Sequence, residues 1–270
     1  MNLNENYSLE QLETGILKCL WCNLSEEDPK ITFNNKAHTI PQSLGGKFLC
    51  NNVCDRCNQY FGSPEYNRPS VEVVLREGFE LTRHMTFSNE KKKSNTYARF
   101  KSTFFKLNTA NKTFSLKPIY SIKNGFQASM ARQFKRGLFK IFLEEYQRQT
   151  NKGMDSRFDF IREFARYDLN DIPVFYMTPK LPVLFYIESE FIAPELNFHQ
   201  NLQKKIDNYE FYDLNIFGHG FLIPTYRNWN LTYESNIQKA KIDLDGRYTE
   251  FKLIKSFEDV DFSLKFIGSE

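Results

Sequence analysis

The chain has 270 residues, of which 41% are hydrophobic and 26% charged, the composition of an ordinary globular protein able to bury a substantial core. Its formal net charge of +3 is too small to indicate a partner by itself. The N-terminus lacks the features of a signal peptide and the apolar runs are too short to cross a bilayer, so we expect a cytoplasmic protein without membrane segments.

Charge is distributed unevenly along the chain. Residues 1–64 carry 5 basic and 7 acidic side chains, residues 65–150 carry 17 and 7, and residues 151–270 carry 14 and 19. The basic middle segment suits an anionic polymer such as a nucleic acid. A solvated charged surface around strands is the alternative explanation.

Residues 1–64 are predicted to form a small module. A short helix over 8–18 leads into 19–64, a segment rich in Gly, Asn and Cys and poor in large apolar side chains. Such a segment cannot bury enough apolar surface to fold unaided, so it needs a cross-link. Pro64 and Pro69 mark its end.

Four cysteines form two C-x-x-C pairs, Cys19 with Cys22 and Cys54 with Cys57. The two-residue gap lets both sulfurs of a pair face one ion, so the pairs predict a structural Zn²⁺ site with four thiolates. Buried thiols without a metal and a redox-active pair are the alternatives. Cys50 is expected to be a packed or semi-exposed thiol, although it could replace a ligand. Because zinc with four thiolates has no open position, any catalysis must come from other residues.

Residues 65–270 are predicted to form a larger mixed α+β region with antiparallel strands. From 79 to 123 apolar and polar residues alternate, with turn residues between the runs, as in paired strands. After residue 172 strand patterns return, at 173–177, 182–193, 211–226, 230–234 and 249–257.

Two helices are predicted between these groups of strands, over 126–149 and over 155–167, the second with Asp155 or Ser156 as its N-cap. The first helix has an apolar face made of Met130, Phe134, Leu138 and Ile141. It also has a basic stripe made of Arg132, Arg136 and Lys140. The stripe predicts contacts with the DNA backbone, and a solvated helix face is the alternative.

Between its cysteine pairs the sequence resembles the HNH endonuclease superfamily, in the variant with two zinc-binding C-x-x-C knuckles. Besides the four cysteines, the matching residues are His38, Ile40–Pro41, Leu44–Gly45–Gly46, Asn52, Asn58 and Phe61–Gly62. The resemblance covers residues 19–64 and implies the ββα-metal fold for them. It says nothing about residues 65–270.

The resemblance implies a metal-dependent endonuclease that hydrolyses phosphodiester bonds in DNA, with RNA as an alternative substrate. His38 would be the general base, Asn52 would orient its ring, and Asn58 would bind a catalytic Mg²⁺ or another divalent cation. The chemistry suits these residue types, since imidazole titrates near neutral pH and a hard cation prefers oxygen ligands. Bacterial restriction or anti-phage defence would suit such an enzyme, acting alone, as a homodimer or with a protein partner.

Ala37 departs from the family pattern, in which Asp or Glu often precedes the base as a metal ligand. Alanine cannot bind a cation, so the ion would be held by Asn58, water and phosphate, or by an acid elsewhere. The alternative function is a catalytically inactive, zinc-stabilised module that binds nucleic acid or another partner. Of the other histidines, His219 is expected to be structural, and His84 and His199 have no ligand-like neighbours.

Overall fold

The computed structural model describes residues 15–65, 68–88, 100–108, 110–111, 113–180, 194, 196, 211–229, 234–235, 237–239, 241 and 247–264. Most of the predicted helix over 8–18, the predicted strand over 182–193, most of that over 230–234, and His199 lie outside these residues. The described part is α+β, as predicted, with helices beside antiparallel sheets. None of its helices is long and apolar enough to cross a membrane.

The N-terminal module is a strand–strand–helix unit. Its elements are β1 (Ala37–His38), η1 (Gln42–Leu44, a 3-10 helix), β2 (Leu49–Cys50) and α2 (Asp55–Gly62). β1 and β2 pair antiparallel. The segment that connects β1 to β2 requires glycine at two positions. Gly45 has φ of 89°, in the left-handed region, and a Cβ on Gly46 would lie 1.8 Å from the carbonyl oxygen of Ile40.

Helices and a hairpin follow: α3 (Val71–Ser88), β3 (Phe105–Asn108), β4 (Thr113–Leu116), α4 (Pro118–Ser121), α5 (Phe126–Thr150), η3 (Ser156–Phe158) and α6 (Asp159–Ala165). The prediction of a strand from residue 79 was wrong, since 79–87 belong to α3. Leu75 and Phe79 are four residues apart on α3, so they lie on one face of this helix, and that face packs on α5. The two helices approach closely, because a Cβ on Gly137 would lie 2.4 Å from Cγ of Leu75.

The prediction of strand at 118–121 was also wrong, because Pro118 begins the short helix α4 there. The β3–β4 hairpin and helix α5 confirm the predictions for their segments, and the four residues of the predicted apolar face are buried. The helix predicted over 155–167 consists of the 3-10 helix η3 followed by the α-helix α6. Of the two predicted caps, Asp155 is the one observed, and it caps η3, since its side chain accepts the backbone N–H of Arg157 at 2.9 Å.

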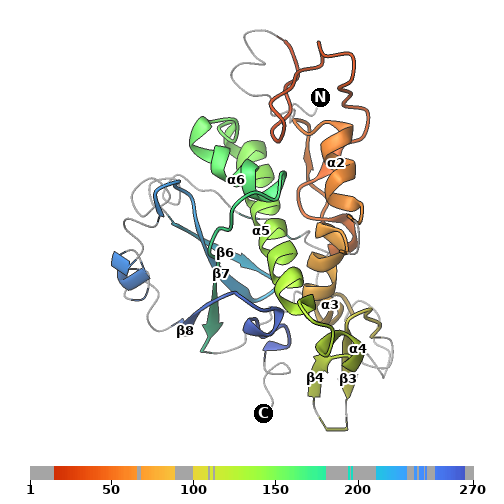
Figure 1. Cartoon of the computed structure of the whole chain (residues 1–270), viewed down its shortest axis with the longest axis vertical. Helices are drawn as coiled ribbons and strands as arrows, with labels where there is room; N and C mark the ends of the chain where they lie inside the picture. The colour runs from red at the N-terminus through yellow and green to blue at the C-terminus, as the bar shows by residue number, and fades with distance from the viewer. Residues whose placement is uncertain are drawn as a thin grey trace.

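A four-stranded antiparallel sheet completes the fold. Its strands are β5 (Phe175–Pro179), β6 (Phe211–Ile216), β7 (His219–Pro224) and β8 (Tyr248–Leu253), in the order β6-β7-β5-β8. In Figure 1 α5 runs between this sheet and the helices α2 and α3. Aromatic side chains of α5 contact the sheet. For example, the ring centroids of Phe142 on α5 and Tyr212 on β6 are 5.3 Å apart. One continuous core cluster includes side chains from both sides of the predicted boundary at residue 64, which stays a prediction.

His219 lies in the aromatic core, and among the described residues neither of its ring nitrogens has a hydrogen-bond partner. The rings around it belong to Phe79, Tyr176, Phe221 and Phe262. His219 is the first residue of strand β7, and the predicted structural role fits this place. Burial lowers the pKa of His219 from 6.5 to about 4, and the charge of Asp261 offsets only part of that effect.

We expect this histidine to make the protein less stable in acid. The folded state binds the proton more weakly than the unfolded state, so the free energy of unfolding should fall by about 3 kcal/mol as the pH falls from 6.5 to 4. Chemical unfolding at several pH values measures this loss, and His219→Leu, which cannot titrate, should lack it. Parallel pH profiles for the two proteins would contradict the prediction.

Candidate metal centre and active site

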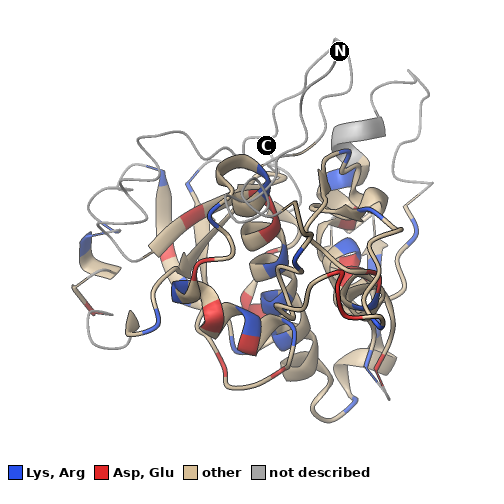
Figure 2. Ribbon diagram, turned by 90° about the horizontal axis from the view of Figure 1, so that it is seen from above, with Lys and Arg blue, Asp and Glu red and all other residues tan. Residues whose placement is uncertain are grey.

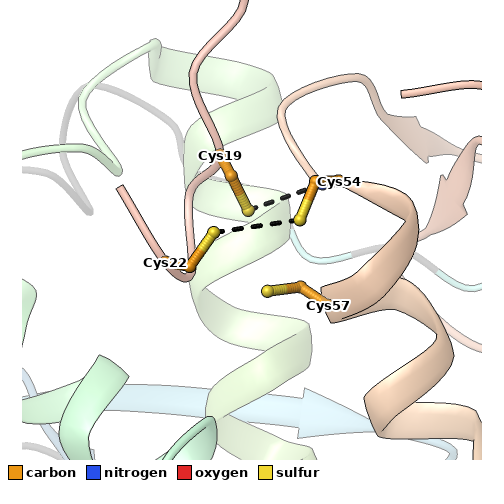
Figure 3. A group of neighbouring side chains, drawn as sticks. All are labelled: Cys19, Cys22, Cys54 and Cys57. Atoms are coloured by element: carbon orange, nitrogen blue, oxygen red, sulfur yellow. Dashed lines mark hydrogen bonds between the residues drawn. The ribbon is translucent and has the colours of Figure 1, made fainter. Parts of the chain in front are cut away.

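The four predicted zinc ligands meet in one place. The sulfurs of Cys19, Cys22, Cys54 and Cys57 all lie within 4.8 Å of one another, and those of Cys22 and Cys54 are 3.8 Å apart. A tetrahedral zinc with Zn–S bonds of about 2.3 Å places its sulfurs about 3.8 Å apart. Figure 3 shows the side chains converging from the loop before β1 and from the N-terminal end of α2. The donor set therefore fits a structural Zn²⁺, as the sequence predicted.

Donor groups from the protein surround the sulfurs. The backbone N–H groups of Trp21 and Cys54 each donate to Sγ of Cys19 at 3.4 Å. Nε of Arg166 donates to Sγ of Cys57 at 3.3 Å. Because four thiolates around Zn²⁺ leave two negative charges, a guanidinium and N–H dipoles are the partners that such a centre needs.

The thiols interact strongly with one another. Hydrogen bonds with Cys22, Cys54 and Cys57, together with burial, raise the pKa of Cys19 above its ordinary value. The hydrogen bonds with Cys19 act in the opposite direction on Cys22 and Cys54 and lower the pKa of both. The four thiols thus share a reduced number of protons, and zinc binding should release those that remain. Cys50 is buried and is not part of the cluster, and burial raises the pKa of its thiol. Of the two environments that the sequence left open for Cys50, the structure shows the packed one.

His38 lies on the outer face of the β1–β2 hairpin. Its neighbour Ala37 is fully buried, as is Cys50, with which Ala37 pairs across the hairpin. Side chains alternate along a strand, so His38 and its partner Leu49 point the other way, and both are at least partly exposed. The imidazole is therefore not enclosed in the core.

A buried ion pair on α5, formed by Lys140 and Glu144, fixes the backbone of His38. Nζ of Lys140 donates to the carbonyl oxygen of His38 and to the carboxylate of Glu144, both at 2.9 Å. The other oxygen of Glu144 accepts Nε1 of Trp21, which lies between the first two cysteines, at 2.9 Å. Burial raises the pKa of Glu144 to about 7, although Lys140 and Trp21 act to lower it. One connected network thus joins the zinc knuckle to the candidate base.

Removing Lys140 should be costly, because Glu144 would remain buried without its counter-ion. We expect Lys140→Met to lower the free energy of unfolding by about 3–5 kcal/mol, measured by chemical unfolding at neutral pH. The double variant Lys140→Met, Glu144→Gln should recover part of that loss, because the glutamine is neutral and still accepts from Trp21. A single variant as stable as the unmodified protein would contradict the prediction.

Asn52 is buried at the junction between the module and α5. Its Oδ1 accepts Nε2 of Gln147 at 3.3 Å, and its Nδ2 donates to the carbonyl oxygen of Lys18 at 3.5 Å. These bonds give Asn52 a role in fixing the module on the helix. Its predicted role in orienting the ring of His38 stays a prediction.

Asn58 is partly exposed on α2, one residue after Cys57. The nearby Asp55 holds the loop before β1. Its carboxylate accepts the hydroxyl of Thr32 at 2.5 Å and the backbone N–H of Asn35 at 2.7 Å. Slight desolvation acts to raise its pKa, but these bonds and that from the backbone of Asn34 hold the pKa of Asp55 below its ordinary value.

The basic stripe on α5 needs a correction. Arg136 and Lys140 are both 0% exposed, so neither lies where a nucleic acid could contact it. Arg136 donates to the carbonyl oxygen of Ala165 at 3.0 Å and to the hydroxyl of Tyr60 at 2.5 Å. Arg132 is partly exposed, but Nε of its guanidinium donates to Asp168 at 2.6 Å. In Figure 2 the blue and red positions are interspersed over the described part of the chain.

The burial of this stripe had no signal in the sequence. Every residue from 133 to 147 is buried. Yet the apolar side chains cover only one side of the helix, and the other side carries polar residues at helical spacing, namely Gln133, Arg136, Lys140, Glu144 and Gln147. Such a polar side is typical of a helix face in solvent. The spacing of the basic residues could not reveal their partners, which come from β1, α2, α6 and the segment after α6.

Comparison with known families agrees with the site. Residues 19–65 match the model of the family described as HNH endonuclease. This confirms the resemblance seen in the sequence and points to nuclease activity in general. Comparisons with curated proteins and with solved structures gave no match.

Proposed function

From the match of residues 19–65 to the HNH endonuclease family, we propose that this chain is a metal-dependent endonuclease that hydrolyses phosphodiester bonds in DNA. The observation that carries the proposal is the position of His38, a partly exposed imidazole on a hairpin that is braced by the cysteine cluster and by Lys140. Restriction or anti-phage defence would be a setting for this activity.

In the proposed reaction His38 accepts a proton from the water that attacks the phosphorus atom. The P–O bond to the leaving nucleotide breaks, and the leaving oxygen takes a proton from solvent. Lys140 fixes the carbonyl of His38 and so restricts the movement of the strand that carries the base. The amide oxygen of Asn58 is a ligand of the kind that Mg²⁺ or Mn²⁺ accepts. A bound cation of this type relieves negative charge at the scissile phosphate.

Contacts to the DNA backbone are proposed for the module itself, since two of the three stripe residues are buried. Its exposed cationic side chains are Lys30, Lys36, Lys47 and Arg56. Phosphate contacts of this kind release counter-ions, so binding should weaken steeply as salt rises.

The experiment is to incubate supercoiled plasmid with the zinc-loaded protein and Mg²⁺, Mn²⁺ or Ni²⁺, and to follow nicked and linear products. A parallel assay with RNA decides between the two substrates. A gel-shift assay without divalent cation measures binding separately. An inactive binding module would shift DNA in the gel and leave the plasmid intact with every cation.

A further inference from the structure

Glu72, in the first turn of α3, approaches the candidate active site from outside the zinc module. Its Oε1 lies 3.5 Å from Nζ of Lys140, the ammonium that also binds the carbonyl oxygen of His38. The ammonium of Lys140 therefore contacts both the carboxylate of Glu72 and the backbone carbonyl of His38. The sequence gives no sign of this, since the two residues lie on different elements.

The other oxygen of Glu72 faces α2. A Cβ built on Gly62 would lie 3.6 Å from Oε2 of Glu72, so this oxygen lies against the last turn of the helix. Asn58 is four residues before Gly62, and residues at this spacing share a helix face, about one turn apart. The carboxylate thus lies against the face of α2 to which position 58 belongs.

Around Lys140 there are more acidic than basic side chains. Glu72 and Glu144 both approach Lys140, so two carboxylates share one ammonium. The side chain of Glu144 is fully buried and both its oxygens accept hydrogen bonds, from Trp21 and Lys140. The side chain of Glu72 is 30% exposed, which makes it the carboxylate of the two that a cation from solvent can reach.

Position 37 cannot supply that carboxylate. Ala37 is 0% exposed and faces the core together with Cys50, so a side chain there points away from solvent. A hydrolytic cation needs oxygen ligands with negative charge at a place open to a phosphate. Glu72 has a partly exposed carboxylate that lies beside Lys140, which binds the backbone carbonyl of His38, and against the last turn of α2.

We infer that Glu72 is a ligand of the divalent cation in the proposed active site, together with Asn58. The inference rests on the proposed function for the meaning of the site, but it makes a separate claim about cation binding. The ligand class is a hard divalent cation such as Mg²⁺ or Mn²⁺, bound through oxygen.

The test is a titration of the zinc-loaded full chain with Mn²⁺, in which free Mn²⁺ is measured by electron paramagnetic resonance. We expect Glu72→Gln to weaken Mn²⁺ binding about ten-fold or more, with zinc content and melting temperature retained. The matched control is Glu163→Gln on α6, a glutamate of similar exposure that is also ion-paired, which should bind Mn²⁺ unchanged. Glu72→Asp, which keeps the charge on a shorter side chain, should lie between the two.

The outcomes separate the two claims. Unchanged Mn²⁺ affinity in Glu72→Gln, or no Mn²⁺ binding by the unmodified chain, overturns the inference. If either of these results is obtained and plasmid nicking still requires His38, the proposed function stands and only the role of Glu72 as a ligand fails. If Mn²⁺ binding depends on Glu72 but no nucleic acid is cleaved, the cation site stands and the proposed function fails.

Discussion

Replacing His38 by alanine should reduce plasmid nicking by at least about 10²–10⁴-fold, the contribution that a positioned general base makes to hydrolysis. No other imidazole is close to it in the sequence of the module, which has a single histidine. Because the side chain is partly exposed and belongs to a two-residue strand, its loss should leave the fold intact. The initial rate of conversion from supercoiled to nicked plasmid, at saturating Mg²⁺ or Mn²⁺, measures the effect.

The control for this variant is His84→Ala, which removes another partly exposed histidine, on α3. It should nick plasmid at the rate of the unmodified protein. Zinc content, melting temperature and the gel shift of DNA should be the same for both variants, which separates loss of chemistry from loss of binding. If His38→Ala nicked plasmid as fast as the unmodified protein, the proposed mechanism would be wrong.

Loss of zinc should unfold the module, the largest stability effect that we expect for this protein. Structural zinc contributes about 10–16 kcal/mol of apparent binding free energy at pH 7 in small domains, and this segment has few large apolar side chains to replace it. The loop that carries Trp21 packs on α5, so the effect should reach the rest of the core. We therefore expect Cys54→Ala to bind no zinc and to melt at a much lower temperature.

The control is Cys50→Ala, because Cys50 is a buried thiol outside the cluster. It should keep one zinc per chain, measured by mass spectrometry under native conditions, and should lose only the modest stability of a small core truncation. A strong chelator added to the unmodified protein should reproduce the melting curve of Cys54→Ala. The four-thiolate zinc site would be refuted if Cys54→Ala kept stoichiometric zinc.

The structure also explains why zinc and activity should be coupled. Trp21 of the first knuckle donates to Glu144, Glu144 accepts from Lys140, and Lys140 holds the carbonyl of His38. If the knuckle opens, Glu144 loses a donor and the pair that positions the strand is disturbed. A zinc ion in the cluster would thus support the proposed base through packing and hydrogen bonds, without an open coordination position.

Several features of this protein could be read from the sequence alone because they depend on short spacings. A C-x-x-C pair sets the distance between its two sulfurs locally, and two pairs are enough to predict the ion. The order of His38, Asn52 and Asn58 between and after these pairs predicted the family, and the match to residues 19–65 confirms it. The long helix α5 and the β3–β4 hairpin also follow from local periodicity.

Contacts between distant residues were decided only by the tertiary structure. Lys140 and His38 are 102 positions apart, and Trp21 and Glu144 are 123 apart, so no local pattern pairs them. Basic residues at helical spacing look the same whether they face solvent or buried carbonyls and carboxylates. Packing of α5 between the module and the sheet placed Arg136 and Lys140 in the core, because their charges could be satisfied there by groups from other elements.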